Sequence, residues 1–305
     1  MRLFLFREAA TYTSHTLCLA SAENRPRMAY SFAAKTSPAS NLKKVARSQV
    51  KKARIETAMA DTQEATHQVR KRCKKMRALM RLTRNKNAYT EQLYLSENAR
   101  YRRIGQLLSE HRDAVSLYEA VRKQLGANDF PQISAFLEAR IEGDDIAQLR
   151  AAAELLRRGK QQIQNWEIED LTWRDLERGY KKRYRKATKA LQKAMEMESD
   201  ESFHELRKRV KDHWYHSRLL KKRYPKKVGR RCKPLKALAS DLGDWRDLRL
   251  LCHFLALNSA RLGGDAGAEL IPLLDKAQQR LLELRKKIDR QTRTLFTRKH
   301  RIKLK

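Results

Sequence analysis

The chain has 305 residues, of which 69 are lysine or arginine and 35 are aspartate or glutamate, so its net charge is +34. Hydrophobic residues make up 41% of the sequence, which is enough to form a core and excludes a fully disordered protein. Ten glycines and six prolines are few turn formers for this length, and no segment alternates β-branched and polar residues. The sequence therefore predicts an all-α fold. No apolar run approaches the ~18–20 residues that a membrane span requires.

The first half of the chain carries clear helix-start signals. Ser37 followed by Pro38 is typical of an N-cap and a first helical turn, and it opens a predicted helix that runs to about residue 59. The spacing of Asp61 and Glu64 predicts a capping box for a second helix to about residue 83. Further helices are expected over 90–109, 112–125, 130–141 and 144–164.

A looser stretch over 165–172 separates the two halves, and Thr172 with Asp175 predicts the capping box of the next helix. Helices are then expected over 173–197, 201–222, 231–241, 245–260 and 266–296. We interpret the chain as a disordered leader over 1–37, with Met28 as an alternative start, and two helical bundles. The bundles are predicted over 38–165 and 170–300, followed by a basic tail over 301–305.

An internal repeat supports this division. Residues 66–84 (THQVRKRCKKMRALMRLTR) align with residues 203–221 (FHELRKRVKDHWYHSRLLK) at an offset of 137. Later in each half an Arg-Asp pair recurs, at Arg112-Asp113 and Arg246-Asp247. The duplication predicts two similar helical bundles. The coinciding residues are His67/His204, Arg70/Arg207, Lys71/Lys208, Arg72/Arg209, Lys74/Lys211 and Arg81/Arg218.

One face of the helix predicted over 62–83 is a row of basic residues. These residues follow one another at steps of three and four, so they share a face about 25 Å long. Nine lysines and arginines and no acid occur between residues 65 and 90. An ordinary solvated helix mixes signs at i,i+4, because like charges at that spacing destabilise it by a few tenths of a kcal/mol. The row therefore indicates a polyanionic partner. Its members are His67, Arg70, Lys74, Arg77, Arg81 and Arg84.

The second copy keeps this row, except that Trp214 stands at the position of Arg77. Two other predicted helices add cations. They are the first helix, which starts at Pro38, and the helix that contains residues 178–189. The candidate polyanion-binding residues are His67, Arg70, Lys71, Lys74, Arg77, Arg81, His204, Arg207, Lys208, Lys211, Arg218, Lys222, Arg47, Lys51, Lys182 and Arg185.

No metal or cofactor site is expected. His213 and His216 lie at i,i+3, but no third ligand completes a coordination set at a recognisable spacing. The four cysteines lack CxxC spacing, which favours reduced thiols in a cytoplasmic protein over a disulfide framework or a zinc site. They are Cys18, Cys73, Cys232 and Cys252.

The two HxxRKR…K…R segments, each followed by a helix with an Arg-Asp pair, resemble the CHAD family of α-helical domains. The resemblance extends to MAYSF…KKVARSQVKKA and covers about residues 28–300. It implies two antiparallel four-helix bundles around a basic central channel that binds inorganic polyphosphate without catalysis, in a cytoplasmic protein associated with polyphosphate granules. Trp214, His213 and His216 depart from the basic pattern of the family.

Two alternatives were weighed against polyphosphate binding. A nucleic-acid-binding helical protein would suit the net charge, the ten cations of residues 285–305 and the four tryptophans, but no helix-turn-helix, RNP, KH or zinc-finger pattern occurs. An enzyme acting on phosphoanhydrides would need a bound metal or a placed carboxylate pair. The string over 167–170, EIED, lacks the lysine of an ExExK motif. We therefore expect a protein that is not an enzyme.

Overall fold

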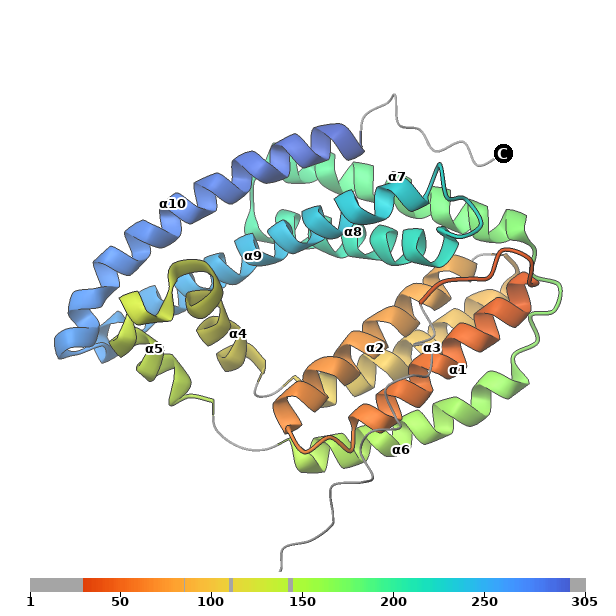
Figure 1. Ribbon diagram of the computed structural model, residues 1–305, viewed down its shortest axis with the longest axis horizontal. Helices are drawn as coiled ribbons and strands as arrows, with labels where there is room; N and C mark the ends of the chain where they lie inside the picture. Colours follow the sequence, from red (N-terminus) through yellow and green to blue (C-terminus); the bar gives the residue numbers. More distant parts are fainter. Residues whose placement is uncertain (1–29, 85, 110–111, 142–144, 297–305) are drawn as a thin grey trace, which may run out of the picture.

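The computed structural model describes residues 30–84, 86–109, 112–141 and 145–296 (Figure 1). This part of the chain is built from α-helices with short 3-10 and π turns and contains no strand, which confirms the all-α prediction. The proposed start at Met28 and the basic tail over 301–305 lie outside the described residues. The α-helices are α1 (Pro38–Glu56), α2 (Thr62–Thr83), α3 (Ala88–Leu107), α4 (Arg112–Ala120), α5 (Pro131–Glu138), α6 (Ile146–Gln162), α7 (Trp173–Met197), α8 (Asp200–Leu220), α9 (Cys232–Leu257) and α10 (Gly264–Leu295).

The helices begin where the capping residues predict. The Ser37 hydroxyl accepts a hydrogen bond from a backbone amide of the first turn of α1, and Pro38 occupies its first position. The Asp61 carboxylate accepts from the third amide of α2. Thr172 and Asp175 form a complete capping box at α7, with both reciprocal hydrogen bonds present. These contacts satisfy backbone amides that have no partner inside the helix.

One helix prediction was wrong. The sequence indicated separate helices over 231–241 and 245–260, whereas α9 runs without a break from Cys232 to Leu257. Gly243 weakens the helix at that point on propensity grounds. In the fold, however, Gly243 is buried beneath the side chain of Arg207, so the missing side chain provides room for a neighbour.

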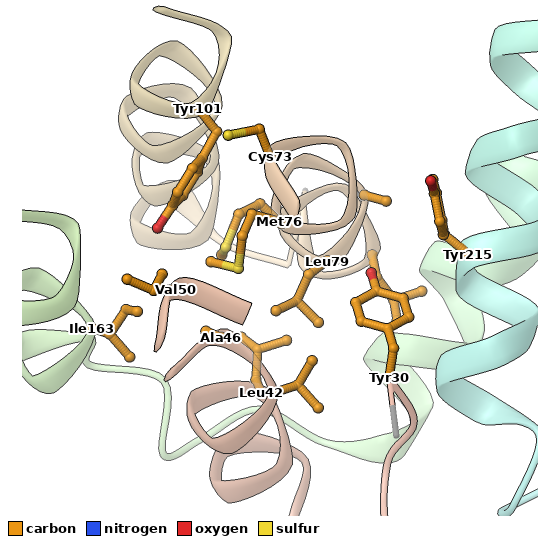
Figure 2. Close-up of a cluster of buried hydrophobic side chains, with 14 of the residues drawn as sticks. Tyr30, Leu42, Ala46, Val50, Cys73, Met76, Leu79, Tyr101, Ile163 and Tyr215 are labelled. Carbon is orange, nitrogen blue, oxygen red and sulfur yellow. The ribbon is translucent and has the colours of Figure 1, made fainter. Parts of the chain in front are cut away.

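The buried side chains form two hydrophobic cores. The first joins α1, α2, α3 and α6, and Figure 2 shows Leu42, Met76, Tyr101 and Ile163 within it. The second joins α9 and α10 with α4 and α5, which come from the first half of the sequence. Helices α7 and α8 contribute residues to both cores. The core that a residue joins therefore does not follow from its position along the chain. The internal duplication and the two bundles over 38–165 and 170–300 stay predictions.

Helix α2 is the part of the first core that packs against α7 and α8. The Nε2 atom of His216 on α8 lies 2.7 Å from the carbonyl oxygen of Ala78 on α2. A Cβ atom added to Gly179 on α7 would lie 2.0 Å from the carbonyl oxygen of Leu82. The backbones of α2 and α7 therefore approach as closely as a glycine permits.

Residues 30–37, the end of the stretch expected to be a leader, also join the cores. The Phe32 amide donates to the Leu219 carbonyl oxygen at 2.8 Å. The Tyr30 hydroxyl donates to the Lys75 carbonyl oxygen at 2.7 Å. Tyr30 and Phe32 are both buried, so this segment ties α1 to α2 and α8.

We predict that Gly179→Ala destabilises the protein by about 1–3 kcal/mol or more, because the new methyl group forces α2 and α7 apart. Chemical denaturation of the variant measures the loss. Gly105→Ala on α3 is the matched control, since nothing lies within 4 Å of its added Cβ. That control should be neutral or gain about 0.5–1 kcal/mol. Equal denaturation midpoints for the two variants would contradict the close approach.

Candidate anion-binding site

The structure brings basic residues of α2 and α8 together. Burial and the nearby charges of Arg207 and Lys71 together lower the pKa of Lys211 to about 8. Lys71 lies on α2 and the other two on α8, so the two sequence segments singled out by the repeat meet in space. We call this group, together with Lys75 and Arg218, the central cluster.

Lys75 is the member of the central cluster that the sequence analysis missed. Its side chain is buried, and burial together with Arg72, Arg218 and Lys71 lowers its pKa to about 7. Its Nζ atom lies 5.7 Å from the centroid of the Tyr30 ring.

Arg218 lies near the same ring, with its Cζ atom 5.5 Å from the Tyr30 centroid and 5.2 Å from the Trp214 ring. Aromatic faces attract cations, so these rings partly offset the positive charge of Lys75 and Arg218. Trp214 stands at the position of Arg77 in the repeat, and its ring thus faces the guanidinium of Arg218, a cation of the second row.

A second group of cations lies where α2, α7 and α8 meet. Burial lowers the pKa of Lys186, and Arg183, Arg209, Lys182 and Arg84 lower it further. We call these five residues the lateral cluster. The sequence analysis placed only Lys182 among its candidate binding residues, although the cation-rich stretch 178–189 also contains Arg183 and Lys186.

Arg183 is the most buried member of the lateral cluster, with 3% of its surface exposed. Its Nη2 atom donates to the carbonyl oxygen of Arg81 at 3.3 Å. Its Nε atom has no hydrogen-bond partner within the described part of the chain. Burial of a cation is unfavourable unless it is compensated, so an external anion at this position would stabilise the cluster.

Arg77 and Arg81, from the predicted row, lie between α2 and its neighbours and hold them together. The Arg81 guanidinium donates to Asp212 on α8 at 3.1 Å and to Asn98 on α3 at 3.4 Å. Arg77 donates to the same Asn98 oxygen at 3.0 Å. These two arginines therefore have a packing role in addition to any role in anion binding.

Arg70 also has a structural role. Its Nη1 atom donates to the carbonyl oxygens of Gly105 and Leu108, at 2.5 and 2.6 Å. These are among the last carbonyls of α3, which have no partner inside the helix. A substitution of Arg70 would therefore disturb the end of α3 as well as the basic row.

His204 is a neutral imidazole at pH 7. Partial burial, together with the charges of Arg246, Lys208 and Arg207, lowers its pKa to about 4. Its Nδ1 atom is buried without a hydrogen-bond partner among the described residues. A charged imidazole at this position would require a bound anion that raises the pKa.

Three candidates lie on surfaces away from both clusters, and the others differ in how far they are exposed. Arg47 and Lys51 are exposed on α1, which packs mainly on α2 and α6, and Arg185 is exposed on α7. The side chains of Arg112 and Asp113 lie outside those described. Lys71, Lys74, Lys182, Lys208 and Lys222 are exposed, while His67, Lys211 and Arg218 are partly buried.

The described residues contain no group of three or more His, Cys, Asp or Glu side chains that could hold a metal ion. Within the same ranges, no helix has both the length and the apolar character to cross a membrane.

These features define an all-α protein with clusters of lysine and arginine where its two cores meet. The family model described as CHAD domain matches residues 44–256, more than half of the 305 residues. The chain therefore belongs to the CHAD domain family, which confirms the resemblance drawn from the sequence.

A solved structure agrees with this assignment. The crystal structure of the CHAD domain from the plant Ricinus communis superposes with a TM-score of 0.50 at 16% sequence identity. The match covers 87% of this chain and 89% of that one, and at this identity it shows a similar fold alone. No curated protein matches the chain.

The buried histidines of α8 predict acid sensitivity. Burial lowers the pKa of His216 to about 3 and that of His213 well below its usual value. The unfolded chain binds these protons near pH 6.5. Stability that is present above about pH 6.5 is therefore lost as the pH falls, by about 2 kcal/mol per histidine between pH 7 and 5.

His213→Phe tests this prediction, because the His213 ring packs among Tyr180, Tyr184 and Phe296 and neither ring nitrogen has a partner among the described residues. Urea denaturation at pH 7 and 5 should show a smaller loss in this variant than in the parent. His253→Phe, at an exposed position on α9, should leave the loss unchanged. The same loss in His213→Phe as in the parent would contradict the prediction.

Proposed function

We propose that this protein binds inorganic polyphosphate along α2, α7 and α8, through the central and lateral clusters, and does not change it chemically. The observation that carries the proposal is that the charges of Lys71 on α2 and Arg207 on α8 both act on the partly buried Lys211. Burial and like charges both disfavour the ammonium form of Lys211, and an external polyanion would offset them. A basic channel between two bundles remains a prediction.

Polyphosphate suits the chemistry of both clusters. It is a flexible polymer with about one negative charge per unit, so it needs neither bases to be read nor a groove of fixed width. Arginine gives paired hydrogen bonds to phosphate oxygens and lysine gives a point charge. The mixture of Lys71, Lys211 and Arg207 offers both. Bound to such a polymer in the cytoplasm, the protein would be found on polyphosphate granules.

Removal of two cations of the central cluster should weaken binding. We expect Lys71→Gln with Lys211→Gln to raise the Kd for long-chain polyphosphate by about tenfold or more near 100 mM salt. The slope of log affinity against log salt should fall by about two. Fluorescence titration at two salt concentrations measures both quantities, with duplex DNA as the competing polyanion.

Lys160→Gln with Lys286→Gln is the matched control, since both lysines are exposed, on α6 and α10, and the net charge changes equally. It should move the Kd by less than about threefold. Equal weakening by the two pairs would mean that net charge alone drives binding. Tighter binding of DNA than of polyphosphate would favour a nucleic-acid function, and shortening of the polymer during the titration would indicate an enzyme.

Binding should also take up protons. The pKa of Lys211 is about 8 in the ligand-free protein, and bound phosphate raises it because it favours the ammonium form. Affinity should therefore be highest below pH 8 and fall on the order of tenfold between pH 7.5 and 9.5. Lys211→Arg keeps the charge over this range and should reduce the fall. An identical pH profile in this variant would contradict the assignment to Lys211.

A further inference from the structure

The guanidinium group of Arg207 lies directly on the backbone of α9. A Cβ atom added to Gly243 would lie 3.1 Å from Nη2 and 3.3 Å from Nε of Arg207. Gly243 is buried within α9, where a glycine disfavours the helix. Its missing side chain therefore creates the space that the guanidinium occupies.

Two carboxylates of α9 flank this position. Asp244 follows Gly243 directly, and Asp247 comes one helical turn after it. Burial lowers the pKa of Arg207 and the charge of Arg246 lowers it further, while the charges of Asp247 and Asp244 raise it. Asp247 acts in the same direction on Lys211.

The neighbouring carboxylate on the same helix has another partner. Asp241 accepts hydrogen bonds from Lys287 at 2.9 Å and from Gln291 at 2.7 Å, both on α10. Its charge is therefore directed towards α10. Asp244 acts on Arg280 of α10 as well as on Arg207. Asp247, whose Oδ1 lies 4.0 Å from Nη1 of Arg246, acts on Arg207 and Lys211. Arg207 thus has internal anions beside it in the ligand-free protein.

We propose that the segment Gly243–Asp247 of α9 is an internal dock for Arg207, in which Asp244 and Asp247 compete with polyphosphate for the guanidinium. This inference rests on the proposed function and deepens it, because it names residues that limit affinity. An anion must replace the carboxylates to engage Arg207. Polymers with closely spaced charges do so more readily than sparsely charged anions.

Asp247→Asn tests the competition, with long-chain polyphosphate as the ligand at about 50 mM salt. The variant should bind on the order of tenfold more tightly, because the phosphate no longer displaces a full charge. The control is Asp289→Asn on α10, which changes the net charge equally and removes a partner of Arg285 at 3.2 Å. It should move the Kd less than about twofold.

An unchanged Kd, a change equal to that of the control, or weaker binding by Asp247→Asn would overturn the proposal. Weaker binding only in the presence of Mg²⁺ would also overturn it, because the carboxylate would then hold the polymer through a metal ion. In an Arg207→Gln background, the tightening caused by Asp247→Asn should shrink, as expected for coupled residues.

A ligand-free measurement tests the dock independently of polyphosphate. Phenylglyoxal modifies accessible arginines, and peptide mass spectrometry reports the extent at Arg207. Arg207 should be protected in the parent and more reactive in Asp247→Asn and in Gly243→Ala, whose methyl group displaces the guanidinium while favouring the helix. Unchanged reactivity in both variants would overturn the dock. If the parent does not bind polyphosphate, the proposed function is overturned. The phenylglyoxal measurement then decides by itself whether Arg207 is held by the dock.

Discussion

Burial of cations at the α2–α8 contact is the constraint around which the rest of the molecule is organised. Burial, together with the charges of Arg207 and Lys71, lowers the pKa of Lys211 from 10.5 to about 8, which corresponds to about 3 kcal/mol opposing its ammonium form. Packing on either side must exceed this term, and the contacts of His216 with Ala78 and of Gly179 with Leu82 are part of that packing.

The fold compensates these cations in three chemically different ways. Asp212 gives Arg81 a carboxylate partner, and Tyr30 gives Lys75 and Arg218 the face of an aromatic ring. Backbone carbonyls at the end of α3 accept hydrogen bonds from Arg70. The ring and the carbonyls compensate only in part, because neither carries a full negative charge. Net positive potential therefore persists where the helices meet.

Capping residues were sufficient to predict the helix starts at residues 37 and 61, and periodicity predicted the shared face of the basic row. It did not predict partners between helices. Gly243 of α9 lies beneath a side chain from α8, and Lys75 contacts Tyr30, 45 residues earlier in the chain. Likewise α4 and α5 pack with α9 and α10, which no local spacing encodes. Residue spacing defines the faces of a helix, whereas the facing helix follows from the whole topology.

The participation of α7 and α8 in both hydrophobic cores has a consequence for folding. Residues from the first part of α7, such as Tyr180, belong to one core, and Ala187 and Ala194 further along belong to the other. Neither core can lose its structure without exposing apolar surface of the helices that complete the other. The described part of the chain should thus melt in a single cooperative transition, as one thermodynamic unit, and not as two independent halves.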